Sequence, residues 1–369
     1  MRVLRRGSAQ IPQCVGVRKT GGRARGEKGR LLSDDEAALE PAKLFSALAP
    51  GSKLLLAVSG GPDSMALLRL AAAWRDGSRR DGSLTPPALA AATVDHGLRP
   101  ESAAEAEKVA EWSRALGIPH RILLWSGEKP TTGVQERARS ARYHLLCQHL
   151  REIDAEAVAT AHHADDQWET VMMRLSRGSG IAGLAGMSGD QEVFGGRLVR
   201  PLLQVSKATL VDYCRRHGQA FFNDPSNEDP RFERSKWREL AAPLHRLGLT
   251  RERAARLCAR AEKFDHALEW AATRFFSKVE ISNEKNAYDL SAAEDTPQAI
   301  MEYFLQDALS KAAGAPPARL ERLEDFARRL GLALRAGTEL RATLGGCTLA
   351  LNRSKRLRIA LEPERKRGL

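Results

Sequence analysis

Six residues, Ser59-Gly60-Gly61-Pro62-Asp63-Ser64, have the types and spacing of a phosphate-binding loop. They follow a short apolar run and precede an apolar helical pattern, which predicts a strand, a tight turn and a helix start. Glycines let backbone N–H groups approach an anion, and a helix N-terminus adds unpaired donors and partial positive charge. An ordinary Gly-Pro turn is the alternative. The junction of strand and helix favours nucleotide binding by Ser59, Gly60, Gly61, Pro62, Asp63 and Ser64.

Acidic and imidazole side chains follow two further predicted strands. Asp95 and His96 come directly after one strand, and His162 and His163 come after another. In an open parallel sheet the carboxyl ends of the strands share one edge, and ligands bind there. We therefore expect both pairs to lie beside the phosphate-binding loop.

Two carboxylates, Asp166 and Glu169, are three residues apart on the polar face of a predicted helix. Acidic residues near a helix start are mildly favoured in any case. Beside a triphosphate they would also suit Mg²⁺, which prefers oxygen ligands. A zinc site from His162, His163 and Asp166 is a weaker alternative, because neighbouring histidines rarely reach one metal.

An arginine stripe lies on the helix predicted from Thr132. Gln135, Arg139 and Arg142 are spaced four and three residues apart, so they share one side of that helix. Such a stripe is either a solvated face or a set of phosphate contacts. Its position close behind a predicted strand edge makes the two interpretations equally good.

Further arginines, Arg174 and Arg177, precede a glycine-rich segment over 178–187. The segment satisfies G-x-G-x-x-G, but a helix precedes it where a dinucleotide fingerprint needs a strand. A flexible substrate loop is the better interpretation. Residues 231–263, which include Arg234 and Arg238, hold ten Lys or Arg against four Glu. This segment is either a nucleic-acid contact or an exposed linker helix.

Strands must alternate with helices to position these residues. The hydrophobic patterns predict strands over 54–58, 89–94, 120–125 and 156–160, and helices over 63–75, 101–116, 132–150, 165–175 and 207–217. Such alternation predicts an α/β domain with a parallel sheet. Residues 76–87 are typical of a surface loop. Helices over 254–276, 299–312 and 320–336 and an alternating 338–361 segment predict a mainly helical second domain with a terminal β-hairpin.

Length and composition agree with two domains. The chain has 369 residues, is 43% hydrophobic and carries a net charge of +12. Most of that charge lies at the ends, since residues 1–30 carry nine Lys or Arg and one Glu. We expect a basic, disordered extension over 1–40, a catalytic domain over 41–240 and a second domain over 250–369. The five cysteines are scattered without a C-x-x-C pair, and no membrane or signal segment is evident, which favours the cytoplasm.

Together these motifs resemble the bacterial tRNA(Ile)-lysidine synthetases, a family of PP-loop ATP pyrophosphatases. The resemblance spans about 53–240 and includes the segments 59–64, 94–99, 135–143, 162–170, 177–187, 200–203 and 224–238. One departure is Arg234-Ser235-Lys236-Trp237-Arg238, where the family usually shows Arg-Asn-x-Ile-Arg.

The resemblance implies that the enzyme uses ATP and Mg²⁺ to adenylate cytidine 34 of tRNA(Ile) with a CAU anticodon. The ε-amine of free lysine then replaces AMP at C2, which forms lysidine. A homodimer and recognition of tRNA by the second domain are further expectations. The implied catalytic residues are Asp63, Asp95, His96 and Asp166. The implied substrate, tRNA or phosphate contacts are Arg99, Arg139, Arg142, His162, His163, Glu169, Arg174, Arg177, Arg234 and Arg238, with Mg²⁺ on Asp166 and Glu169.

Three alternatives stay open at this point. A PP-loop cytidine or uridine thiolase is the nearest, although the thiolases that modify an anticodon-loop cytidine carry C-x-x-C pairs that this chain lacks. GMP and asparagine synthetases use the same loop but add an ammonia-supplying domain. A non-catalytic tRNA-binding protein would need no intact Ser-Gly-Gly-Pro-Asp-Ser loop.

Overall fold

The computed structural model describes residues 39–81, 85–97, 101–127, 133–222, 233–313 and 319–362. The expected extension lies almost wholly outside these residues. So do Arg99 and the side chain of Gln135.

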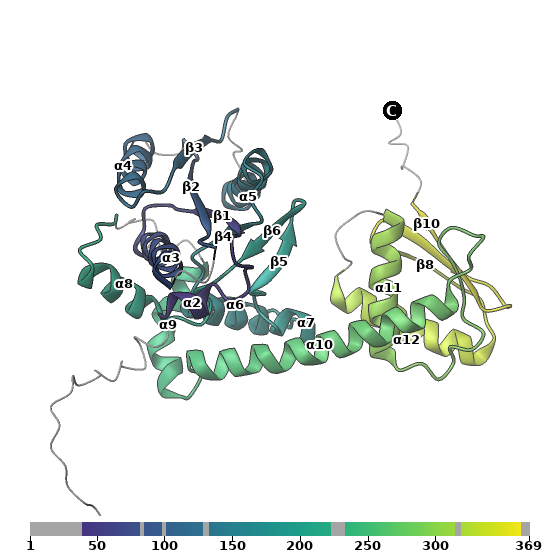
Figure 1. Ribbon diagram of the computed structural model, residues 1–369. Helices are drawn as coiled ribbons and strands as arrows, with labels where there is room; N and C mark the ends of the chain where they lie inside the picture. The colour runs from purple at the N-terminus through teal and green to yellow at the C-terminus, as the bar shows by residue number, and fades with distance from the viewer. Residues whose placement is uncertain are drawn as a thin grey trace, which may run out of the picture.

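A six-stranded sheet forms the centre of the first body (Figure 1). Its elements are α2 (Pro41–Leu44), β1 (Lys53–Ala57), α3 (Pro62–Asp81), β2 (Ala88–Asp95), α4 (Ser102–Ala115), β3 (His120–Leu124), α5 (Val134–Glu152), β4 (Ala157–Ala159), α6 (Ala164–Ser176), α7 (Ile181–Leu184), β5 (Asp190–Val193), β6 (Gly196–Val199), α8 (Lys207–Arg216) and α9 (Glu233–Arg246). The strand order is β3-β2-β1-β4-β6-β5, and only β5 runs antiparallel to its neighbour.

Both faces of this sheet are covered. Leu54 and Leu56 of β1 point into a core shared with α3, α4 and α8, whereas Leu55 points into a core shared with α5. All three leucines are fully buried, so β1 is an apolar run without alternation, as expected of a central parallel strand. Strand order reverses at β1, because β2 pairs on one side and β4 on the other. This switch point is where ligands bind in such folds.

The second body is a helical layer on a small antiparallel sheet. Its elements are α10 (Arg251–Val279), β7 (Ala287–Asp289), α11 (Gln298–Ala313), α12 (Leu320–Ala336), β8 (Leu340–Leu344), β9 (Cys347–Leu351) and β10 (Arg356–Leu361). The sheet order is β7-β10-β9-β8. Phe304, Tyr288 and Leu330 are buried in a core separate from those of the first body.

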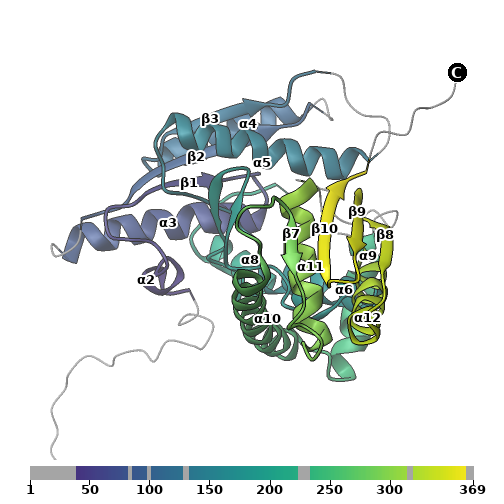
Figure 2. The ribbon, with the colours of Figure 1, turned by 90° about the vertical axis from the view of Figure 1, so that its right-hand side faces the viewer.

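One long helix, α10, joins the two bodies. It begins under α6 and α7 and ends against α11. Figure 1 shows it running beneath both bodies, and Figure 2 views it nearly end on. Ala254 and Cys258 pack against Trp168 of α6, whereas Phe276 packs against Phe304 of α11. The same rigid element therefore carries packing surfaces for both cores.

The α/β class, the helical second region and its terminal sheet are confirmed. The loop predicted over 76–87 is wrong in its first half, because α3 continues to Asp81. Arg75, just before this segment, is buried and donates to the carbonyls of Leu116 and Gly117. These hydrogen bonds stabilise the extension of the helix. The helix α9 falls within residues 231–263, for which a linker helix was one of the two interpretations. The hairpin β5–β6 and the strand β7 were not predicted. These strands are three or four residues long, too short for a periodic signal.

Candidate active site

The phosphate-binding loop lies where β1 ends and α3 begins. Its turn is held from within: the Ser64 hydroxyl accepts from the Ser59 N–H at 3.1 Å and donates to the Gly61 carbonyl at 2.9 Å. Gly60 has φ +88°, and a Cβ there would lie 2.9 Å from Phe222 and Val109. Only glycine fits this position. Because glycine has no side chain, the backbone N–H groups of the loop stay accessible to an anion.

Asp63, in the first turn of α3, faces the start of α6. Its Oδ2 atom lies 3.5 Å from His163 Nε2, which is also 3.5 Å from Asp166 Oδ2. Asp63 Oδ1 is buried and has no hydrogen-bond partner among the described residues. A buried carboxylate oxygen without a donor is costly unless a ligand supplies one. This atom therefore fits a contact with a bound cation or substrate.

His163 caps α6 and links the two carboxylates. Its Nδ1 accepts from the Asp166 N–H, and Asp166 Oδ2 in turn accepts from the His163 N–H, which makes a reciprocal cap. Burial disfavours a charged ring, but Asp63, Asp166 and Asp165 outweigh it and raise the pKa of His163. Because Nδ1 accepts the cap hydrogen bond, Nε2 is the ring nitrogen that faces Asp63 and Asp166.

Two arginines of α9 reach the carboxylates of α6. Arg238 Nε donates to Glu169 Oε1 at 2.6 Å, and Arg234 Nη1 lies 3.4 Å from Asp166 Oδ1. Burial disfavours ionisation of Asp166, but His163 and Arg234 lower its pKa. Burial raises the pKa of Glu169 despite its hydrogen bond to Arg238.

These ion pairs bear on the metal prediction. Asp166 and Glu169 are already engaged by arginines, whereas Asp63 has an oxygen to spare. Within the described ranges, no group of three or more His, Cys, Asp or Glu side chains could hold a metal ion. Mg²⁺ commonly needs only one or two carboxylates together with substrate phosphates. The geometry therefore favours Asp63 over Asp166 and Glu169 as the ligand, and gives the zinc alternative no support.

The His162 ring lies partly buried next to Thr160. His162 Nδ1 is 2.9 Å from Thr160 Oγ1, and burial lowers the pKa of His162 to about 3, with Arg200, Arg139 and Arg234 acting in the same direction. The His162 ring is therefore neutral at physiological pH. It is a hydrogen-bonding group there and carries no charge for a phosphate.

Arg200 was not among the predicted site residues. Its guanidinium is buried, donates to the Ser188 carbonyl at 2.6 Å and has a buried Nε without a partner among the described residues. Burial lowers the pKa of Arg200, and Arg139, whose guanidinium lies 5.1 Å from the Tyr143 ring centroid, acts in the same direction. Arg200 lies in the 200–203 segment that carries part of the family resemblance, and this was the sequence signal for the position.

The remaining predicted arginines have different surroundings. Arg142 is exposed on α5. Arg174 donates to the carbonyls of Gly183 and Gly186, and so ties the glycine-rich segment to α6. Arg177 pairs with Glu233 at the start of α9. Phosphate contacts by these three residues stay predictions, and Arg174 has a structural task that the sequence did not reveal.

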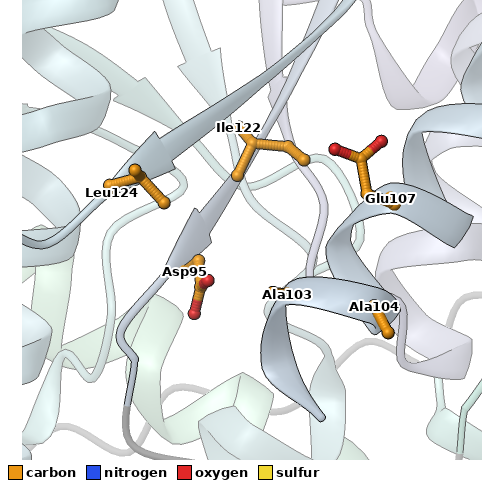
Figure 3. A pocket seen from close by; sticks show the side chains of 6 residues that line it. All are labelled: Asp95, Ala103, Ala104, Glu107, Ile122 and Leu124. Atoms are coloured by element: carbon orange, nitrogen blue, oxygen red, sulfur yellow. The ribbon is translucent and has the colours of Figure 1, made fainter. Parts of the chain in front are cut away.

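Asp95 and His96 follow β2 at the same sheet edge. Asp95 Oδ1 accepts from the Gly97 N–H at 2.8 Å, and the His96 ring makes an edge contact with Trp125. Beside Asp95 lies an open pocket of about 390 Å³ between β2, β3 and α4 (Figure 3). Glu107, Ile122 and Leu124 line it, which combines carboxylate and aliphatic surfaces.

The start of α10 is fixed to the same helix that carries the acidic residues. Arg251 Nε and Nη2 both lie 2.6 Å from Asp165 Oδ1, and Trp168 Nε1 donates to the Leu249 carbonyl at 2.7 Å. Asp165 Oδ2 also accepts from the Lys207 N–H. Sequence analysis missed this junction, because its partners are about 80 residues apart along the chain.

Comparisons with known proteins agree with this geometry. Residues 34–244 match the PP-loop domain family. The chain is 42% identical to a tRNA(Ile)-lysidine synthase of Rhodopseudomonas palustris, over 91% of this chain and 99% of that protein. It is 45% identical to one from Methylobacterium nodulans, over 87% and 94% of the two chains.

A solved structure shares the fold at low identity. The U34-tRNA thiolase NcsA from Methanococcus maripaludis, with its [4Fe-4S] cluster, aligns with a TM-score of 0.50 at 16% identity, over 62% of this chain and 78% of that one. No helix in the described part of the chain has the length and apolarity to cross a membrane. The identity to curated relatives along nearly their full length, with the PP-loop match, shows that the chain belongs to the tRNA(Ile)-lysidine synthase family.

Proposed function

We propose that this protein joins free lysine to C2 of cytidine 34 in tRNA(Ile) with a CAU anticodon, with ATP as the activating reagent. The observation that carries the proposal is the loop at 59–64, whose Asp63 meets His163, itself in contact with Asp166, at the switch point of the sheet. Membership of the lysidine synthase family supports the choice of substrate.

The reaction has two steps with balanced leaving groups. The cytidine O2 attacks the α-phosphorus of ATP, and the bond to the β-phosphate breaks, which releases pyrophosphate. The lysine ε-amine then attacks C2, loses a proton, and the C2–O2 bond breaks, which releases AMP. A carbonyl oxygen leaves poorly until it is adenylated, so the first step makes the second feasible.

The loop holds the ATP phosphates in this proposal. Ser59, Gly60, Gly61 and Ser64 surround the anion site, and Pro62 opens the helix whose N-terminus faces it. Mg²⁺ would be held by Asp63 Oδ1 and phosphate oxygens, and would neutralise charge on the phosphates. Preorganised donors of this kind typically supply the largest part of phosphate-transfer catalysis.

Arginines would neutralise phosphates of ATP and of the anticodon loop. Arg139, Arg142 and Arg177 are exposed side chains, and Arg234 is half-buried beside Asp166. Arg238 is held by Glu169, so we assign it to fixing α9 over α6. Arg174 keeps a phosphate contact only through its remaining donors.

Asp95 is our first choice for contacting the reacting cytidine or the lysine amine, and His96 is the second. The ammonium of free lysine has a pKa of about 10.4, so the reaction needs a base or a dry site. The pocket beside Asp95 combines carboxylate with aliphatic surface, which suits an alkylammonium chain. A homodimer and a cytoplasmic location complete the proposal.

The thiolase alternative finds no support at the site. Cys214 is the cysteine beside the loop, with its Sγ 3.4 Å from the Pro62 carbonyl. Burial raises its pKa to about 11, with Asp63 acting in the same direction, whereas sulfur transfer requires a thiolate. The four described cysteines are all buried, in four different elements.

The deciding experiment is incorporation of radiolabelled lysine into transcribed tRNA(Ile) with the CAU anticodon, with and without ATP and Mg²⁺. The methionine tRNA with the same anticodon is the control. We expect ATP-dependent labelling of the isoleucine tRNA alone. AMP release without labelling would point to another nucleophile, and thiolation would be tested next.

A further inference from the structure

A groove on the outer side of α5 adjoins the active site, and the proposed function does not use it. It has a volume of about 340 Å³, and Trp125, His144, Leu145 and Phe194 line it together with small residues of α5. We call it the α5 groove. His144 and Phe194 meet edge to face, with ring centroids 5.9 Å apart.

The aromatic residue at the far end of the α5 groove is unusual for its position. Phe194 is 51% exposed and sits at the turn of the β5–β6 hairpin with φ +49°. Such left-handed positions favour Asn, Asp or Gly and disfavour bulky side chains. An exposed ring in an unfavourable backbone conformation adds nothing to the core, so its use must lie at the surface.

The near end of the α5 groove touches the catalytic edge. The Trp125 ring makes an edge contact with His96 at 5.7 Å between centroids, and the backbone N–H of Trp125 donates to the Asp95 carbonyl at 2.9 Å. The groove therefore begins at the two residues that we assign to the reacting cytidine or lysine. A polymer whose one unit reacts there would lay its next units along α5.

The positive charge around the α5 groove favours a negatively charged polymer. Arg137, Ser140, His144 and Arg151 are spaced three, four and seven residues apart, so they lie along one face of α5 with an arginine at each end. Arg151 also donates to the Phe194 carbonyl at 3.1 Å and so fixes the turn. None of the described residues that line the groove is acidic. Aromatic rings between cations are the usual receptor for unstacked nucleobases.

We propose that the α5 groove binds single-stranded RNA, with a nucleobase of the anticodon loop next to the reacting cytidine stacked on Phe194 and His144. This inference rests on the proposed function for the identity of the RNA, but not for the stacking itself.

The test measures binding of an anticodon stem-loop RNA with a CAU loop to the full-length protein, by fluorescence anisotropy at one fixed salt concentration. Phe194→Asn removes the ring and places a residue that the left-handed turn favours, so the fold is kept. We expect Phe194→Asn and His144→Ala each to weaken binding by about tenfold, the typical loss of one stacked base. Phe264→Ala is the matched control, since Phe264 is an exposed aromatic on α10 away from the groove.

A second arm locates the base. A set of stem-loops is prepared, each of which lacks the base at one loop position other than 34. The affinity of each RNA is measured for the unaltered protein and for Phe194→Asn. We expect one such RNA to bind the unaltered protein about tenfold more weakly, with no further loss in Phe194→Asn, because the partners of a contact are not additive.

Three results would overturn the proposal: unchanged RNA affinity in both variants, additive losses at every loop position, or a change of sedimentation without a change of RNA affinity. The last result would make the groove an interface between two copies of this chain. Failure of the proposed function would be a different result: the unaltered protein would bind the RNA but would not incorporate lysine into it.

Discussion

Asp63 Oδ2 and His163 Nε2 lie 3.5 Å apart, and this contact joins the phosphate-binding loop to the capped start of α6. The two residues are a hundred positions apart along the chain. Asp63 follows β1 and His163 follows β4, and these two strands are hydrogen-bonded neighbours. The contact therefore places the first turn of α3 beside the acidic helix α6 and the arginines that pair with it.

Loss of the Asp63 carboxylate should stop adenylation and spare tRNA binding. Asp63→Asn keeps the shape but removes the charge that faces His163 and that we propose holds Mg²⁺. We expect pyrophosphate release to fall by about a thousandfold, the usual effect of losing one preorganised electrostatic group. tRNA affinity, measured by filter binding, should change less than about twofold by comparison. Retained turnover would remove Asp63 from the mechanism.

The glycines of the loop offer a matched pair. In Gly60→Ala the new Cβ would meet Phe222 and Val109 at 2.9 Å with φ +88°, so the loop must shift. In Gly61→Ala the nearest atom is Ser59 Oγ at 3.9 Å, an ordinary contact. We expect Gly60→Ala to raise the KM for ATP by about tenfold or more and Gly61→Ala to be milder. Equal effects of the two substitutions on the KM would contradict this account.

The Arg238–Glu169 pair should contribute to stability through burial of the carboxylate. Glu169 is almost fully buried and Arg238 is about a third exposed. Arg238→Gln leaves the carboxylate with only the more distant Arg234, at 3.9 Å, and we expect a loss of about 2 kcal/mol, below the range for fully buried pairs. Urea unfolding measures it. Adding Glu169→Gln should restore part of the loss, because no uncompensated charge then remains. Further destabilisation in the double variant would disprove the pairing argument.

His162 should make the fold sensitive to acid. Burial lowers its pKa from 6.5 to about 3, so the unfolded chain binds a proton that the folded protein excludes. The contribution of the neutral ring is present above pH 6.5 and is lost as the pH falls from 6.5 towards 3, at up to about 1.4 kcal/mol per pH unit. His162→Asn should flatten the unfolding free energy over that range. His266→Asn, on an exposed part of α10, should leave the slope unchanged.

Removal of the second body should separate tRNA recognition from chemistry. A cut near 245 would take away Leu249 and Arg251, which bind Trp168 and Asp165, and would damage the site itself. A cut after Lys263 keeps those contacts. We expect this shorter chain to modify an anticodon stem-loop within about threefold of the full-length rate but to lose most of its affinity for whole tRNA. Circular dichroism confirms folding, and equal affinity for whole tRNA would deny the second body a recognition role.

The sequence by itself determined the local parts of this protein. The apolar run of β1, the glycines after it and the periodic helices identified the α/β class, the loop at 59–64 and the acidic helix, because strand burial and turn chemistry are short-range effects. The same local signals placed Asp95 and His163 at strand ends, and so at one edge of the sheet.

Only the tertiary structure decided which of these residues touch. Arg234 and Arg238 lie about 70 positions beyond their carboxylates, and their pairing leaves Asp63 with the free oxygen. The burial of Arg200 against the Ser188 carbonyl and the ion pair of Arg251 with Asp165 likewise depend on how distant elements dock. Periodicity cannot report such contacts, because ion pairs between distant elements depend on how the helices dock after the sheet has formed.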